Sequence, residues 1–289
     1  MYAVTGVSRQ LGNLIVKELI KSAPPANIVA VMRTPEKAGD LESLGLAVRL
    51  GNYDQPETLV AALAGVERLL LVSSDLTGRL QHHKPIIEAA KAAGVKLLAY
   101  ASMLHADQSP TKLAKAHLET EHALIASGMT TVFLRNGRCT ENYLLALRPA
   151  LVQGALYGAA GEGRISPAAC SDYAAAASVV LLSNNPARVY ELAGDSACTL
   201  GELAAEISRQ AGQEVAHHDL PQEVYESGLV AAGLSAEWAN LLADADARAA
   251  EGALFDAGQA LRRLIGRPTT PAAETIAASL RELGKTTWF

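Results

Sequence analysis

The chain has 289 residues, a length that favours one large domain or a domain with a smaller second domain. Hydrophobic residues make up 49% of it, which is enough for a sizeable core. Its net charge of −5 leaves no basic surface of the kind that binds nucleic acid or an anionic membrane. No apolar run approaches the roughly 20 residues that span a bilayer, and no secretory leader pattern opens the chain, so we expect a cytoplasmic protein.

Six short apolar runs alternate with helix-period segments in the first half of the chain. The runs lie at 2–5, 28–33, 47–50, 68–73, 96–102 and 131–135. The helical segments lie at 11–21, 36–44, 56–63, 80–93 and 112–127. Strands that alternate with helices predict a parallel sheet covered on both faces. We therefore expect an α/β fold with a Rossmann-type, doubly wound parallel sheet over residues 1–140.

The pattern changes after residue 140. We expect helices at 141–152, 171–182 and 200–211, short strands at 189–193 and 214–218, and a mainly helical tail from residue 221. Residues 141–289 are therefore predicted to form a smaller, mainly helical C-terminal lobe that binds substrate, and the chain can interleave between the two domains.

The first strand leads through a glycine turn into an amphipathic helix, the setting in which a nucleotide pyrophosphate lies at a helix N-terminus. Gly6 allows the tight turn and Gly12 allows close packing of the helix on the strand. Where a middle glycine is expected, Arg9 and Gln10 stand instead, which either weakens binding or supplies an extra cation. Arg33 ends the second strand, where arginine suits the 2′-phosphate of NADP and an acidic residue would suit NAD. The sequence therefore predicts NADP (NADPH) as cofactor.

Matching stretches run along almost the whole chain, at 4–12, 28–33, 69–74, 89–95, 102–107, 134–143, 158–161, 189–195 and 264–270. On these stretches the chain resembles the NmrA-like, atypical short-chain dehydrogenase/reductase family. Within it, the chain is most similar to the NADPH:quinone oxidoreductases of type 2 and more distantly to triphenylmethane reductase. The resemblance implies cofactor contacts from the glycine loop, the second strand, the fourth strand and the segment after the sixth. These are Gly6, Ser8, Arg9, Gln10, Leu11, Gly12, Arg33, Val72, Ser73, Ser74, Asn136, Gly137, Glu141 and Asn142.

The chain departs from the subfamily pattern at three further positions. Arg138 and Cys139 replace an aromatic pair, and Cys170 replaces a basic residue. Their effect on the choice of substrate stays open. The three cysteines include no CxxC pair, so no metal site is expected.

The usual tyrosine–lysine pair of short-chain dehydrogenases is missing, because none of the eight tyrosines has a lysine four residues later. A quinone acceptor needs no strong acid, since its reduced oxygen has a pKa near that of tyrosine, roughly 10. The candidate catalytic groups are His105, Asn136 and Tyr143. His117 and Glu121, spaced i and i+4, can pair on one helix face.

Together these features predict an NADPH-dependent oxidoreductase that passes a hydride directly to a quinone or a similar flat electrophile. Two alternatives remain open, a non-catalytic NADP(H)-binding sensor or regulator of the NmrA type, and a reductase of dyes or enones. The expected partner is a small-molecule electron acceptor, with no nucleic acid or membrane, and the expected state is a monomer or a homodimer.

Overall fold

A computed structural model describes residues 1–72 and 79–285 of the chain. The chain divides into two compact units. Unit 1 comprises residues 1–106, 116–136 and 170–190, and unit 2 comprises residues 107–115, 137–169 and those from 191 onward. Both units are therefore assembled from segments that are far apart in the sequence.

Seven strands form one sheet in the order β3-β2-β1-β4-β5-β6-β8. The strands are β1 Tyr2–Val4, β2 Ile28–Met32, β3 Ala47–Leu50, β4 Arg68–Leu71, β5 Leu97–Met103, β6 Thr131–Asn136 and β8 Val189–Leu192. The pairs from β3 through β6 are all parallel. The strand order reverses between β1 and β4, which is where sheets of this kind bind nucleotides. The predicted α/β fold with a parallel sheet is confirmed.

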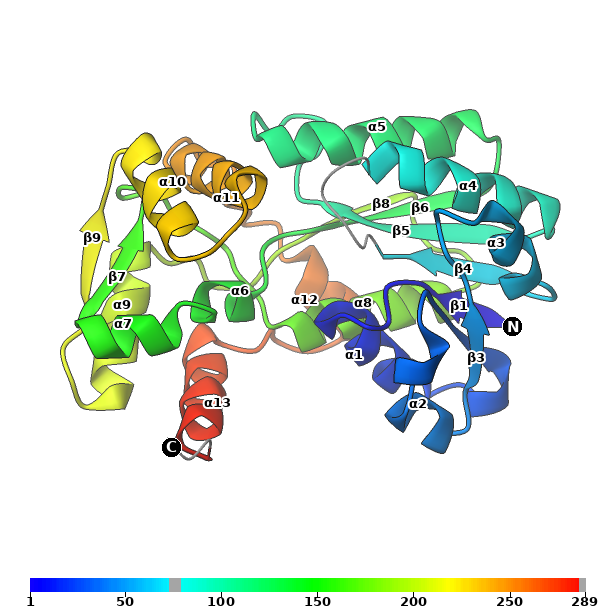
Figure 1. Ribbon diagram of the computed structural model, residues 1–289, viewed down its shortest axis with the longest axis horizontal. Helices are drawn as coiled ribbons and strands as arrows, with labels where there is room; N and C mark the ends of the chain where they lie inside the picture. The colour runs from blue at the N-terminus through cyan, green and yellow to red at the C-terminus, as the bar shows by residue number, and fades with distance from the viewer. Residues whose placement is uncertain (73–78, 286–289) are drawn as a thin grey trace. The chain divides into compact units, whose positions relative to one another are not determined.

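Helices cover both faces of this sheet (Figure 1). They are α1 Gln10–Leu19, α2 Asp40–Ser43, α3 Pro56–Ala62, α4 Arg79–Ala92, α5 Lys112–Ala126 and α8 Cys170–Leu182, with short 3₁₀ turns at Pro25–Asn27 and Pro35–Lys37. α3, α4 and α5 lie on one face, and α1 and α8 lie on the other. The helix expected at 36–44 is shorter than predicted. Only α2, at Asp40–Ser43, is α-helical, and Pro35–Lys37 forms a 3₁₀ turn.

The main core of unit 1 lies between the sheet and α3, α4 and α5. Leu59, Leu69, Ile86, Tyr100 and Phe133 are almost completely buried in it. On the opposite face, α1 packs along the alanine-rich α8, whose small side chains let the two helices approach closely. Burial on both faces explains why the strands read as continuous apolar runs.

Unit 2 is mainly helical, with one small two-stranded sheet (Figure 1). Its helices are α6 Thr140–Leu144, α7 Leu147–Gln153, α9 Leu200–Ala211, α10 Gln222–Ala231, α11 Ala236–Ala249, α12 Ala260–Ile265 and α13 Ala272–Lys285. β7 Ala155–Gly158 and β9 Ala216–Asp219 form a parallel pair. α10 and α11 pack against each other, and α10 has no fully buried residue.

Three predictions for the second half of the chain were wrong in detail. The helix expected at 141–152 is two helices, because Pro149 lacks an N–H and its ring excludes a helical carbonyl at Leu145. The strand expected at 189–193 is β8, and it extends the main sheet beside β6 instead of serving the C-terminal lobe. The glycine-rich stretch after residue 153 contains β7, which was not predicted.

Each helix of the described residues is too short or too polar to cross a membrane.

Candidate active site

The turn after β1 is built around two glycines that the backbone requires. Gly6 has a φ of +66°, a left-handed conformation that side chains disfavour. A Cβ atom on Gly12 would lie 2.3 Å from the carbonyl oxygen of Gly6, so the first turn of α1 packs directly on the loop. Thr5 anchors the loop to β4, because its hydroxyl bonds both the amide and the carbonyl of Val72, at 2.9 and 3.2 Å. The predicted strand–turn–helix geometry is therefore present.

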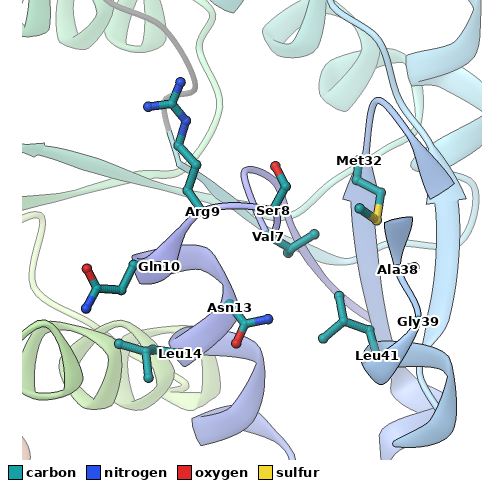
Figure 2. Close-up of a pocket in the computed structure, with 10 residues that line it drawn as sticks. All are labelled: Val7, Ser8, Arg9, Gln10, Asn13, Leu14, Met32, Ala38, Gly39 and Leu41. Atoms are coloured by element: carbon teal, nitrogen blue, oxygen red, sulfur yellow. The ribbon is translucent and has the colours of Figure 1, made fainter. Parts of the chain in front are cut away.

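Arg9, which replaces the middle glycine, occupies the N-cap of α1. Its φ of −106° and ψ of 161° are extended backbone that any residue adopts. Its amide bonds the carbonyl of Gly6 at 3.1 Å, and its carbonyl accepts the first helical bond, from Asn13, at 3.0 Å. The exposed side chain points away from the helix in Figure 2. An arginine at this position therefore leaves the loop conformation intact.

A pocket of about 570 Å³ opens between the start of α1 and the segment after β2 (Figure 2). It is lined by Val7, Ser8, Arg9, Gln10, Asn13, Leu14, Met32, Ala38, Gly39 and Leu41. No side chain caps the N-terminus of α1, so its first amides, with the positive end of the helix dipole, are suited to an anion. Apolar walls with a few polar groups suit an adenosine moiety.

The other predicted cofactor residues of unit 1 lie around this pocket and at the ends of the strands. Leu11 is in the first turn of α1, and Arg33 is exposed directly after Met32, a lining residue. Val72 follows β4, whereas Ser73 and Ser74 lie outside the described residues. Sequence reasoning did not identify the other residues that line the pocket, which are Val7, Asn13, Leu14, Met32, Ala38, Gly39 and Leu41.

Asn136 and His105 lie at neighbouring strand ends. Met103 pairs with Asn136 in the sheet, and the amide of Leu104 bonds the carbonyl of Asn136 at 2.9 Å. His105 follows with a φ of +53°, an uncommon conformation for a side-chain-bearing residue. The amide oxygen of Asn136 is buried and has no hydrogen-bond partner in the described part of the chain. The sheet thus brings two of the three candidate catalytic residues together.

The remaining candidates belong to unit 2, on and just before α6. Gly137 donates its amide to the carbonyl of Leu192 at 2.7 Å, while Glu141 and Asn142 lie in the first turn of α6. Tyr143 is 8% exposed, and burial raises the pKa of its hydroxyl above the ordinary value while nearby Arg138 lowers it.

Arg138 connects this segment to α11. Its guanidinium carbon lies 4.5 Å from the centroid of the Tyr143 ring, and its Nη1 donates to Oδ1 of Asp246 at 3.0 Å. Asp246 is 108 residues away in the chain and was not predicted as a site residue. No local pattern marks it, because its partner is set by tertiary packing.

A buried polar network lies within unit 1, behind the central strands. His117 contacts Arg79 and Tyr100 through its two ring nitrogens, at 3.0 and 2.8 Å. Glu121 instead accepts two bonds from Arg135, at 3.0 and 2.7 Å. The pairing of His117 with Glu121 that their spacing allows does not form, because each bonds a residue of another element.

Comparison with known proteins places these features in a family. A model described as NAD(P)H-binding matches residues 6–177. The chain is 46% identical to quinone oxidoreductase 2 of Escherichia coli over 96% of this chain and 97% of that protein. The crystal structure of the NADPH-dependent quinone oxidoreductase of E. coli complexed with NADPH matches with a TM-score of 0.94, covering 97% of this chain and 100% of that one.

A second solved structure extends the comparison. Triphenylmethane reductase of Citrobacter sp., complexed with NADP(H), is 34% identical and matches with a TM-score of 0.91, covering 96% of this chain and 100% of that one. The resemblance predicted from the sequence motifs is confirmed.

Proposed function

Because the chain belongs to the NAD(P)H-binding family, we propose that it is an NADPH-dependent reductase that transfers a hydride directly to a quinone or a similar flat electrophile. The observation that carries this proposal is the intact turn between β1 and α1. A Cβ atom on Gly12 would lie 2.3 Å from the carbonyl oxygen of Gly6, which leaves no room for a side chain, and α1 presents uncapped amides beside a pocket. The 46% identity to a quinone oxidoreductase supports the choice of acceptor.

The loop and pocket fit a dinucleotide with a 2′-phosphate. The first amides of α1 would hold the pyrophosphate, and the pocket would hold the adenosine. Arg33 and Arg9 would provide cations for the 2′-phosphate. A charge-assisted hydrogen bond of this kind contributes about 1.5–3 kcal/mol, which is roughly 10- to 100-fold in affinity. When bound, NADPH would supply the hydride, which carries both electrons of the reduction.

The protein's own groups orient the acceptor and exclude water. Asn136 and His105 at the strand ends, and Tyr143 of unit 2, are the residues that we assign to this task. Because the reduced quinone oxygen has a pKa of roughly 10, water or a weak donor suffices for its protonation. This explains how the chain can work without a tyrosine–lysine pair.

The test is a titration with NADPH and NADH by nicotinamide fluorescence, followed by NADPH oxidation with a panel of quinones and a triphenylmethane dye. In Arg33→Ala, NADPH affinity should fall about 10- to 100-fold while NADH affinity barely changes. Lys91→Ala, an exposed lysine of α4, is the charge-matched control. Equal losses for both cofactors would remove Arg33 from the 2′-phosphate.

The same experiment separates the alternatives. Binding of NADPH without oxidation by any acceptor would favour a sensor of the NmrA type. Faster reduction of the dye than of every quinone would favour a reductase of dyes or enones. The 34% identity to triphenylmethane reductase supports this alternative.

We further propose that the protein acts in the cytoplasm as a monomer or a homodimer, with small molecules as its partners. The net charge of −5 supports the exclusion of nucleic acid. Sedimentation equilibrium would decide the oligomeric state.

A further inference from the structure

The polar side chains of the pocket beside α1 lie at two different places. Ser8, Arg9 and Gln10 lie at the N-terminal end of α1, where the uncapped amides of the helix suit a pyrophosphate. Asn13 lies one helical turn further along, and in Figure 2 its carboxamide points from α1 towards Leu41. Asn13 is therefore placed to meet a part of the ligand other than its phosphates.

Apolar side chains surround the space that Asn13 faces. Val7 comes from the turn after β1, Met32 from the end of β2 and Leu41 from α2, and all three are buried. Gly39 adds no side chain to this wall, and a Cβ atom there would meet no atom of the described residues within 4 Å. Open space between apolar walls suits a flat aromatic base, whose faces need no hydrogen bonds.

The carboxamide of Asn13 is available to such a base. The side chain is partly buried, and within the described part of the chain it makes no hydrogen bond. The backbone amide of Asn13 donates to the carbonyl of Arg9 at 3.0 Å, so the helix fixes the point from which the side chain extends. A carboxamide offers an acceptor, Oδ1, beside a donor, Nδ2. This pair matches the edge of adenine that carries the 6-amino group and N7.

We propose that Asn13 recognises the adenine base of the cofactor, with Oδ1 accepting from the 6-amino group and Nδ2 donating to N7. This inference rests on the proposed function, because it takes a dinucleotide as the ligand. Hypoxanthine carries an oxygen in place of the 6-amino group, so the same edge presents two acceptors, as it does in guanine. Rotation of the carboxamide cannot restore both bonds, since one acceptor of the base must then face Oδ1. Asn13 is therefore a specificity-determining residue for the base.

Four reduced dinucleotides separate recognition of the base from recognition of the phosphate. They are NADPH, NADH and the deamino form of each, which carries hypoxanthine in place of adenine. All four keep the reduced nicotinamide, so its fluorescence measures each dissociation constant in the same way. The wild type should bind NADPH about 5- to 150-fold more tightly than deamino-NADPH, which is the range expected for one bidentate pair. NADH and deamino-NADH should differ by the same factor.

Asn13→Leu keeps a side chain of similar size but removes both hydrogen-bonding groups. It should bind NADPH and deamino-NADPH with affinities within about twofold of each other, while the ratio of NADPH to NADH affinity stays at its wild-type value. Asn13→Ala adds no bulk and should give the same ratios, which controls for a misplaced leucine. Arg33→Ala should do the opposite, changing the phosphate ratio and not the base ratio. Asn27→Leu replaces an exposed asparagine at the other end of β2 and is the matched control.

Two results would overturn the role of Asn13. One is equal affinity of the wild type for NADPH and deamino-NADPH. The other is a wild-type base ratio in both Asn13→Leu and Asn13→Ala. A change in the ratio of NADPH to NADH affinity in these variants, with the base ratio unchanged, would show that Asn13 faces the 2′-phosphate and would also refute the proposal.

Failure of the proposed function gives different results. If the wild type binds none of the four dinucleotides, the cofactor assignment is refuted and the role of Asn13 is refuted with it. If the wild type binds NADPH and discriminates against the deamino form but oxidises NADPH with no acceptor, only the reductase function is refuted.

Discussion

Acidification from pH 8 to pH 5 should destabilise unit 1, because two buried histidines of its polar network are held neutral. The Nε2 of His117 lies 3.0 Å from Nη1 of Arg79, and its Nδ1 lies 2.8 Å from the hydroxyl of Tyr100. A guanidinium can only donate, so Nε2 must accept and Nδ1 must carry the proton. A second proton on Nε2 would put two donors face to face.

The pKa values of both histidines are lowered in the folded state. Burial is the main cause for His83, whose pKa falls to about 3, and the charge of Arg79 adds to it. Burial and then Arg79 also lower the pKa of His117 well below its usual value. In the unfolded chain both groups titrate near pH 6.5, so below this pH the unfolded state binds more protons. Stability is therefore full above pH 6.5 and falls progressively towards pH 3.

The magnitude follows from linkage. Each histidine contributes about 1.4 kcal/mol per pH unit below 6.5, so the two together lower the free energy of unfolding by roughly 4 kcal/mol between pH 8 and pH 5. This is a large share of the 5–15 kcal/mol that stabilises a typical domain. Carboxylates that are stabilised in the folded state add their own loss only at lower pH.

Urea unfolding, followed by circular dichroism at half-unit steps of pH, measures this slope. His83→Gln keeps a neutral hydrogen-bonding group beside Thr120, which lies 3.1 Å from His83, and should halve the slope between pH 6 and pH 5. A wild-type slope below about 1 kcal/mol per unit in this range, or an unchanged slope in His83→Gln, would refute the neutral-histidine argument.

Two further predictions concern close packing and buried charge. Gly12→Ala places a methyl group 2.3 Å from the carbonyl oxygen of Gly6. The free energy of unfolding, measured with urea, should therefore fall by about 1–3 kcal/mol, and NADPH should bind more weakly. Unchanged affinity would contradict the argument that this turn is tightly packed. Glu121→Gln leaves Arg135 buried without a counter-charge. The free energy of unfolding, also measured with urea, should therefore fall by about 3–5 kcal/mol. A loss below about 1 kcal/mol would show that solvent reaches this ion pair.

Local signals predicted the parallel sheet and the cofactor turn. Continuous apolar runs marked the buried strands, and the requirement for Gly6 and Gly12 is set within one loop, so their spacing alone was informative. The sequence could not show that Arg9 would sit in ordinary extended backbone, because that depends on where α1 begins.

Long-range packing explains what was missed. β7 has four residues and is stabilised by its pairing with β9, some 60 residues further on, so its own composition carries little information. The partner of Arg138 is equally remote, and nothing in the surrounding sequence of Asp246 distinguishes it from the acidic residues of an exposed helix face. His117 and Glu121 have the correct spacing to pair, yet Arg79 and Arg135 from other elements take them instead.

The chain departs from the family pattern at two places by carrying an arginine. Arg9 stands in the glycine loop, and Arg138 stands in the segment before α6. At Arg9 the backbone accepts the change without strain, and the side chain is exposed beside a pocket suited to a phosphate-bearing ligand. At Arg138 the new charge is matched by a buried carboxylate, Asp246, that holds it against Tyr143. This pairing matters for the fold, because a buried cation without a counter-charge costs several kcal/mol. Each arginine is therefore accommodated by its own segment of the fold, Arg9 by its extended backbone and Arg138 by its ion pair with Asp246.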